Sequence, residues 1–194
     1  MIKEYRDVKE FGNIKKIDIK LWDRNGKRLW KESNSYPIAD VVAIELPSAA
    51  GQGCFFTSFS KDDVIINDPN STLGKEVVLG LQAMVFGYPL NFYDKMNHFP
   101  MTRIGYVATH PWFDFDSKPC FLIDARLHQG MSGSPVVSYP GKVKVHDKTN
   151  SPHENCSENG NGIFLLGIFS AEYEPLGLNV VWHADIIEDI INNE

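Results

Sequence analysis

Residues 129–137 read Gln-Gly-Met-Ser-Gly-Ser-Pro-Val-Val, a serine flanked by glycines and followed by an apolar run. Gly130 can adopt backbone conformations that a Cβ atom forbids, so its N–H can turn toward a ligand. The N–H groups of Gly130 and Ser132 could together stabilise the negative oxygen that develops when a carbonyl group is attacked. The stretch therefore predicts that Ser132 is a nucleophile in a loop that leads into a β-strand.

Two other interpretations of this serine compete with the first. The nucleophile elbow of an α/β-hydrolase needs Gly-x-Ser-x-Gly between a strand and a helix. Here position 134 is a serine, and Pro135-Val136-Val137 continues as a strand, so this interpretation fits poorly. A glycine-rich hairpin turn with a surface serine needs no chemistry at all, because Gly, Ser and Pro are typical turn residues. That second alternative stays open.

The composition is that of an ordinary globular chain. Its 194 residues are 43% hydrophobic, enough for a sizeable core in one domain or in two small ones. A net charge of −6 argues against nucleic acid or an anionic membrane surface as the main partner. We expect no membrane segment and no signal peptide, because no apolar run is long enough and the start is polar.

The cysteines and histidines predict neither a disulfide framework nor a metal site. Cys54, Cys120 and Cys156 are few, odd in number and far apart, which suggests either a reducing compartment such as the cytoplasm or no dependence on redox conditions. None has the flanking residues expected of a catalytic thiol. A group of His, Asp, Glu and Cys residues between positions 146 and 156 fits no established zinc spacing. We therefore expect no metal and no cofactor.

Short alternating or apolar segments between turn residues predict an all-β chain. Alternation over Ile17–Leu21, the turn Asp23–Gly26 and the return at Leu29 predict a hairpin. Turn-rich residues 47–75 are expected to be a linker. Further strands are expected over Ala39–Leu46, Glu76–Tyr88, Thr102–Thr109, Cys120–Ala125, Ser134–Lys144, Ile163–Ala171 and Leu178–Trp182. The isoleucines after Asp185 lie on one helical face, with Asp185 as the expected N-cap.

The stretch around Ser132 resembles the serine loop of trypsin-like (chymotrypsin-fold) serine peptidases, especially their bacterial and glutamyl-endopeptidase-like branch. Phe86-Gly87-Tyr88-Pro89 is similar to the end of the first strand of the second barrel in bacterial members. Gly167-Ile168-Phe169-Ser170 is similar to the segment that pairs with the substrate backbone and flanks the specificity pocket. Asp40-Val41-Val42-Ala43-Ile44 resembles the strand whose aspartate orients the catalytic histidine.

This resemblance implies a double antiparallel β-barrel with the active site between the barrels and a helix at the C-terminus. Residues 1–46 would be the second half of an incomplete N-terminal barrel, 47–75 the linker, 76–183 the C-terminal barrel and 184–194 the helix. The implied function is a serine endopeptidase that acts on a peptide or protein substrate. Ser132 would be its nucleophile, Asp40 its orienting acid, and the N–H groups of Gly130 and Ser132 its oxyanion hole.

The chain departs from the family at the catalytic histidine. In the family this histidine precedes the aspartate, whereas here no histidine occurs before His98. Without a base Ser132 is a weak nucleophile, so we expect the chain as given to be nearly inactive. It is then either a truncated peptidase or a non-catalytic peptide-binding protein on the same fold. Half a barrel would also expose strand edges and apolar faces, which a second copy could cover.

The resemblance also assigns residues to a specificity pocket, which Ser170 flanks. Arg126 stands six positions before Ser132, at the base of the pocket in trypsin, and His128 stands four before it. A cationic pocket would favour acidic substrate side chains; alternatively, Arg126 pairs with Asp124 or points to solvent. Met131 occupies the position at which zymogen-activated members carry an aspartate, so activation by insertion of a new N-terminus is not expected.

Overall fold

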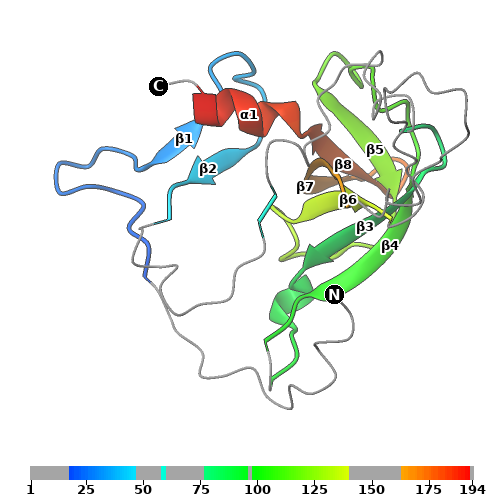
Figure 1. Cartoon of the computed structure of the whole chain (residues 1–194), viewed down its shortest axis with the longest axis horizontal. Coiled ribbons are helices and arrows are strands. Elements are labelled where there is room, and N and C mark those ends of the chain that lie inside the picture. Colours follow the sequence, from blue (N-terminus) through cyan, green and yellow to red (C-terminus); the bar gives the residue numbers. More distant parts are fainter. Residues whose placement is uncertain (1–17, 47–57, 60–76, 96–97, 140–162, 193–194) are drawn as a thin grey trace, which may run out of the picture.

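The computed structural model of the chain describes residues 18–46, 58–59, 77–95, 98–139 and 163–192. It is mostly β-structure, with a closed antiparallel barrel, a separate two-stranded sheet and a C-terminal helix (Figure 1). The small sheet pairs β1 (Trp30–Glu32) with β2 (Val42–Ile44). The all-β class and the C-terminal helix expected from the sequence are therefore confirmed.

The barrel contains six strands. They are β3 (Gln82–Gly87), β4 (Met101–Val107), β5 (Cys120–Asp124), β6 (Pro135–Ser138), β7 (Leu165–Tyr173) and β8 (Leu178–His183). Their spatial order is β3-β4-β5-β8-β7-β6, and β6 pairs back onto β3. The run β6-β3-β4-β5 is a Greek key, because the fourth strand returns to lie beside the first. Closure leaves the barrel without an open sheet edge.

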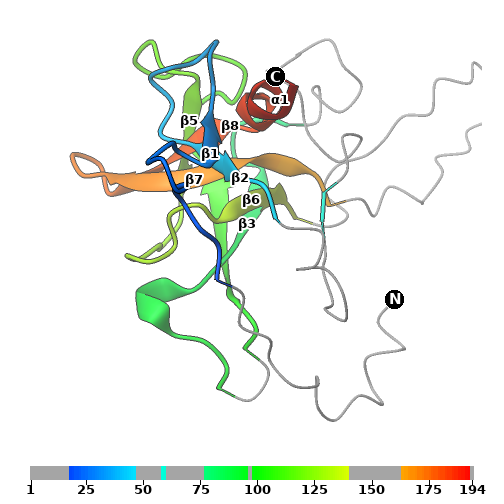
Figure 2. The same cartoon turned by 90° about the vertical axis from the view of Figure 1, so that its left-hand side faces the viewer.

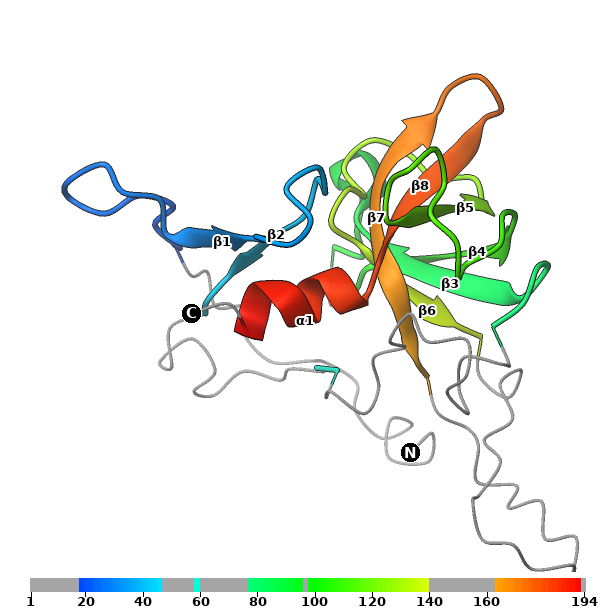
Figure 3. The same cartoon turned by 90° about the horizontal axis from the view of Figure 1, so that it is seen from above.

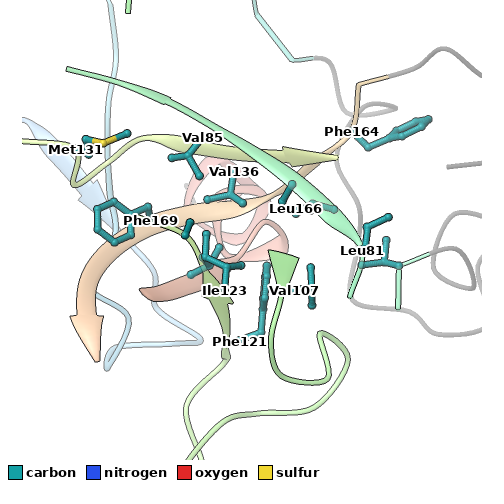
Figure 4. Packing of buried hydrophobic residues seen from close by; sticks show 14 residues of the cluster. Leu81, Val85, Val107, Phe121, Ile123, Met131, Val136, Phe164, Leu166 and Phe169 are labelled. Carbon is teal, nitrogen blue, oxygen red and sulfur yellow. The ribbon is translucent and has the colours of Figure 1, made fainter. Parts of the chain in front are cut away.

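The barrel core is filled by apolar side chains from every strand (Figure 4). Phe121 and Ile123 of β5 are fully buried there, together with Val85 of β3, Val136 of β6 and Val181 of β8. Each such side chain stabilises the fold by about 1.5–3 kcal/mol relative to an exposed one. The inward-facing residues of the strands thus hold the barrel together.

The helix α1 (Asp185–Asn192) leads away from the barrel after β8 and packs against the β1–β2 hairpin (Figure 3). Its buried Ile186 and Ile190 pack in one cluster with Trp182 of β8 and with Val41, just before β2. Asp185 was predicted to be the N-cap, the residue just before the helix. In the structure it is the first residue of α1 instead. Within the described ranges, no helix is long and apolar enough to cross a bilayer.

The N-terminal hairpin is shorter than its sequence pattern predicts. The turn is confirmed, since Asp23 Oδ1 accepts hydrogen bonds from the N–H groups of Asn25 and Lys27, both at 2.8 Å. Only Gly26 has a positive φ there, of 79°. The strand expected over Ile17–Leu21 is wrong in its described part, 18–21, which is not strand. Among the described residues no sheet covers its alternating apolar face, and Leu21 is exposed.

The predicted barrel strands mostly match those observed. Four of them, now β4, β5, β7 and β8, differ from the expected bounds by at most two residues. The strand expected from Glu76 starts only at Gln82, because Gly80 turns the chain with a φ of 77°. The strand expected over Ala39–Leu46 narrows to β2. Residues 140–144, the loop 147–162 and most of the linker 47–75 lie outside the described residues.

Candidate active site

The serine loop, residues 129–134, connects β5 to β6 and is tied to β7. The N–H of Gly133 donates to the carbonyl of Phe169 at 2.8 Å, and the N–H of Phe169 donates back to Ser134 at 2.9 Å. Within the loop, the N–H of Ser134 donates to the carbonyl of Met131 at 2.9 Å. Gly130 and Gly133 both have positive φ, 88° and 85°. The glycines flanking Ser132 therefore let the loop turn sharply between these bonds.

Met131 anchors the serine loop from inside the barrel. Its side chain is fully buried in the core, whereas the neighbouring Ser132 is exposed (Figure 4). Gly87 of β3 lies directly against this anchor: a Cβ there would stand 2.2 Å from Ser134 Oγ and 3.2 Å from the Met131 methyl carbon. The packing beneath the loop thus holds the backbone in place and leaves Ser132 at the surface.

Two backbone donors lie beside Ser132. The N–H groups of Gly130 and Ser132 donate to no residue that the structure describes. Gly130 also passes close to the chain after β3, since a Cβ on it would stand 2.9 Å from the carbonyl oxygen of Tyr88. Two N–H groups that converge beside a serine would be able to bind a carbonyl oxygen or an anion. Their role as an oxyanion hole stays a prediction.

A short hydrogen-bond chain links Ser132 to Asp40 through Ser170. Ser132 Oγ donates to the carbonyl oxygen of Ser170 at 2.7 Å, and Ser170 Oγ donates to Asp40 Oδ2 at 2.7 Å. The three residues come from the serine loop, from β7 and from the entry to β2, which passes beside β7 (Figure 2). Tertiary folding thus brings together three site residues named from the sequence.

No histidine in the described part of the chain supplies a base to this site. Among His98, His110, His128 and His183, none is hydrogen-bonded to Ser132 or Asp40. His183 is buried and stacks on Phe121 with ring centroids 5.8 Å apart. Burial lowers its pKa to about 4, against a smaller opposing effect of Asp114, so its imidazole is neutral at pH 7. His146 and His153 lie outside the described residues.

The two predicted specificity residues lie between β5 and the serine loop but do not join the hydrogen-bond chain. Arg126 is exposed and makes no ion pair with any described residue, so its alternative pairing with Asp124 is not observed. His128 is half-buried, and its carbonyl accepts a hydrogen bond from the N–H of Met131 at 3.2 Å. Their role in a pocket stays a prediction.

The sequence did not reveal how the serine loop is supported from the side opposite β7. The 3-10 helix η5 (Pro89–Asn91) follows β3, and the N–H of Leu90 donates to the carbonyl of Gln129 at 2.7 Å. Leu90 holds a φ of 52°, which residues other than glycine seldom adopt. The proline at position 89 was a signal for a turn, but nothing local indicated its contact with residue 129.

Other reactive side chains in the described ranges do not form a competing site. No three His, Cys, Asp or Glu residues gather there as metal ligands. The group between positions 146 and 156 lies outside the described residues. Cys120 is buried against the α1 cluster, and burial raises the pKa of its thiol to about 11. At neutral pH this thiol is protonated and therefore a poor nucleophile.

Comparison of the sequence with models of known protein families returns no match, and comparison with curated proteins returns none either. Function is therefore inferred from the serine loop and the residues around it. The relevant features are an exposed serine, two N–H groups that donate to no described residue, and a carboxylate reached through one intervening serine.

Proposed function

We propose that Ser132 is the nucleophile of a trypsin-like serine endopeptidase site that acts on peptide bonds. The observation that carries the proposal is the hydrogen-bond chain from Ser132 through Ser170 to Asp40. A generic surface serine in a hairpin turn would not be expected to connect, through one further serine, to a carboxylate from a segment far away in the sequence. The closed barrel and C-terminal helix are compatible with the second half of a chymotrypsin-like fold.

The proposed reaction follows from the positions of these groups. Ser132 Oγ forms a bond to the peptide carbonyl carbon while its proton passes to a histidine base. The carbonyl oxygen becomes negative and accepts hydrogen bonds from the N–H groups of Gly130 and Ser132. The C–N bond then breaks, the amine leaves with the proton from the base, and water hydrolyses the resulting acyl ester.

In this proposal the histidine comes from outside the described residues: from another part of the chain, from a longer chain or from a second protein. Ser132 donates to the carbonyl of Ser170, which cannot take up a proton, so the serine is not activated as it stands. Asp40 Oδ2 accepts from Ser170, whereas Oδ1 accepts from no described residue. That second oxygen is available to hold an imidazole N–H and so select its tautomer.

A non-catalytic peptide-binding role on the same site is the second candidate. It is favoured by one observation, namely that the Ser132 hydroxyl is already bonded to a backbone acceptor rather than to a base. The N–H groups of Gly130 and Ser132 would then bind a peptide carbonyl without attack at its carbon. The two candidates differ in whether Ser132 ever forms a covalent bond.

The proposal includes a partner for the N-terminal hairpin. Large apolar side chains are exposed along and around it, which is unusual for a surface that stays in water. These residues are Ile19, Leu21, Trp22, Leu29, Ile38, Val42, Ile44 and Leu46. Cover from further barrel strands, if the chain is part of a longer one, or from a second copy of the chain would remove them from solvent.

Cleavage preference tests the proposed role of Arg126. An exposed guanidinium near the serine loop would attract an acidic side chain in the substrate residue before the scissile bond. We expect the protein, once supplied with its histidine, to cleave Glu- and Asp-containing peptides in preference to neutral ones, and Arg126→Ala to remove that preference. Profiling of cleaved peptides by mass spectrometry measures it, and a preference for Lys or Arg would contradict the assignment.

Covalent labelling with a fluorophosphonate tests the proposed nucleophile. In this reaction Ser132 Oγ bonds to phosphorus, fluoride leaves, and the proton needs a base. We expect slow labelling of the chain alone and an increase of about tenfold with added imidazole, a small part of what a positioned base contributes. Mass spectrometry should place the adduct on Ser132, and Asp40→Asn should remove most of the imidazole effect.

Three outcomes separate the alternatives. Ser132→Ala is the control and should abolish the adduct. Labelling of several serines at equal rates would support an unspecialised surface turn. If Ser132 remains unlabelled even with imidazole, while the chain binds peptides in a manner that requires the serine loop, the binding role replaces the peptidase role.

A further inference from the structure

We propose that Asp189 of α1 is a positioning residue that holds Asp40 against Ser170 and the serine loop. α1 runs beside the segment that connects β1 to β2, and Asp40 lies at the end of that segment (Figure 3). The effect that we expect of Asp189 on the reactivity of Ser132 rests on the proposed function. The attachment of the hairpin through Asp189 is a structural inference that can be tested without it.

Both carboxylate oxygens of Asp189 receive hydrogen bonds from the connecting segment. Ser33 Oγ donates to Oδ2, Ser35 Oγ donates to Oδ1 at 2.6 Å, and the N–H of Ser35 makes a longer bond of 3.4 Å to Oδ2. Ser33 is buried and in turn accepts from the N–H of Tyr36 at 2.9 Å. We call Ser33, Ser35 and Asp189 the Asp189 clamp. Bonds to an ionised carboxylate are stronger than those between neutral groups.

The clamp is connected to Asp40 by a short anchored path. The carbonyl of Tyr36 accepts a hydrogen bond from the N–H of Ala39 at 2.9 Å. On the other side of Asp40, Val41 is buried against Trp182 and the isoleucines of α1. Asp40 therefore lies between Ala39, which is bonded to Tyr36, and Val41, which packs against α1. Its side chain accepts a hydrogen bond from Ser170 Oγ. The backbone between the Asp189 clamp and the Asp40 carboxylate therefore has little freedom to move.

The hairpin needs such an attachment because it is small. β1 and β2 have three residues each, and a two-stranded sheet of this size is marginal in water by itself. Its position relative to the barrel depends on the apolar cluster around Ile186 and Ile190 and on the clamp. Apolar contacts are not directional, so they hold the hairpin near the barrel without fixing its orientation. The three hydrogen bonds to the Asp189 carboxylate are directional and fix that orientation. A displacement of about 1 Å at a reactive site can cost about 100-fold in rate.

Hydrogen exchange of the whole chain tests the attachment. In Asp189→Ala we expect amide exchange across residues 33–44 to rise about tenfold, the weight of one charged hydrogen-bond pair, with the strands β3–β8 unchanged. Glu188→Gln is the matched control, since it removes the same charge from α1 while the clamp bonds all end on Asp189. Unchanged exchange in the alanine variant would overturn the clamp.

A double-mutant comparison tests whether Asp189 acts through Asp40. With imidazole present, Asp189→Ala should slow phosphonylation of Ser132 about tenfold, whereas in the Asp40→Asn background it should add nothing. An equal loss in both backgrounds would mean general damage to the site and would overturn the positioning role. If Asp189→Ala does not fold, Ser35→Ala removes one clamp bond and Ser35→Thr retains the hydroxyl, so only the first should show the effect.

Failure of the proposed function is distinguishable from failure of this inference. If wild-type Ser132 does not react even with imidazole, the peptidase role fails. The exchange rates of residues 33–44 still decide whether Asp189 holds the hairpin.

Discussion

Replacing Gly130 with alanine is expected to slow the reaction of Ser132 with a fluorophosphonate by about 100-fold, the usual effect of losing one oxyanion donor. Gly130 holds a φ of 88°, and an added Cβ would stand 2.9 Å from the carbonyl oxygen of Tyr88 and 3.3 Å from the nitrogen of Leu90. Both neighbours are backbone atoms that cannot rotate away. The loop must therefore shift, and the N–H of residue 130 moves with it.

Gly133 provides a matched control for this substitution. It has nearly the same positive φ, 85°, but an added Cβ meets nothing within 4 Å. Gly133→Ala should therefore destabilise the fold by about 1 kcal/mol through backbone strain alone, while changing the reaction rate much less. Rates are compared at one imidazole concentration, and stability by urea unfolding. Equal loss of reactivity in both variants would argue against an oxyanion role for the Gly130 N–H.

Gly167→Ala is expected to destabilise the barrel by about 3 kcal/mol, near the upper end for overpacking in a core. Gly167 lies where β7 is paired with β6 and β8 on its two sides. An added Cβ would stand 2.1 Å from the carbonyl oxygen of Trp182 and 2.7 Å from a methyl group of Val181. Accommodating it requires β7 and β8 to separate. Since whole domains are stable by only about 5–15 kcal/mol, the loss should be large in urea unfolding followed by tryptophan fluorescence.

The control for this second substitution lies in the turn between the same two strands. Gly177 has a φ of 64° and open space around its Cβ position, so Gly177→Ala should cost only about 1 kcal/mol. The pair separates collision in the barrel wall from conformational strain in a turn. If the two variants lose the same stability, the close approach of β7 to β8 at Gly167 is not a packing constraint.

Most of the barrel could be predicted because its strands are locally specified. Cys120–Asp124 is an apolar run bounded by turn residues, and such runs become buried strands wherever partners exist. The N-terminal part was predicted less well, because its strand pattern depends on a partner sheet and not on local sequence alone. Ile17–Leu21 alternates as a strand should, but an alternating pattern specifies a strand only when a second sheet is present to bury its apolar face.

For the site, likewise, the residues could be found from local sequence, whereas the contacts between them could not. Ser132 and Gly130 could be found from a continuous motif, and Ser170 and Asp40 from their resemblance to family segments. No local pattern indicated that Ser170 would bond both Ser132 and Asp40, since these partners are 38 and 130 residues away from it. The Asp189 clamp was also missed, because Ser33 and Asp189 are 156 residues apart and each is an ordinary polar residue in its own segment.

The sequence by itself thus determined the chemistry available at the serine loop: a hydroxyl, flanking glycines and no histidine in the first half of the chain. It also determined where most barrel strands lie, since period and turn residues are local properties. Only the tertiary structure decided which distant groups meet that hydroxyl. Barrel closure and the packing of α1 on the hairpin set the position of Asp40, and those are contacts between segments that no single stretch encodes.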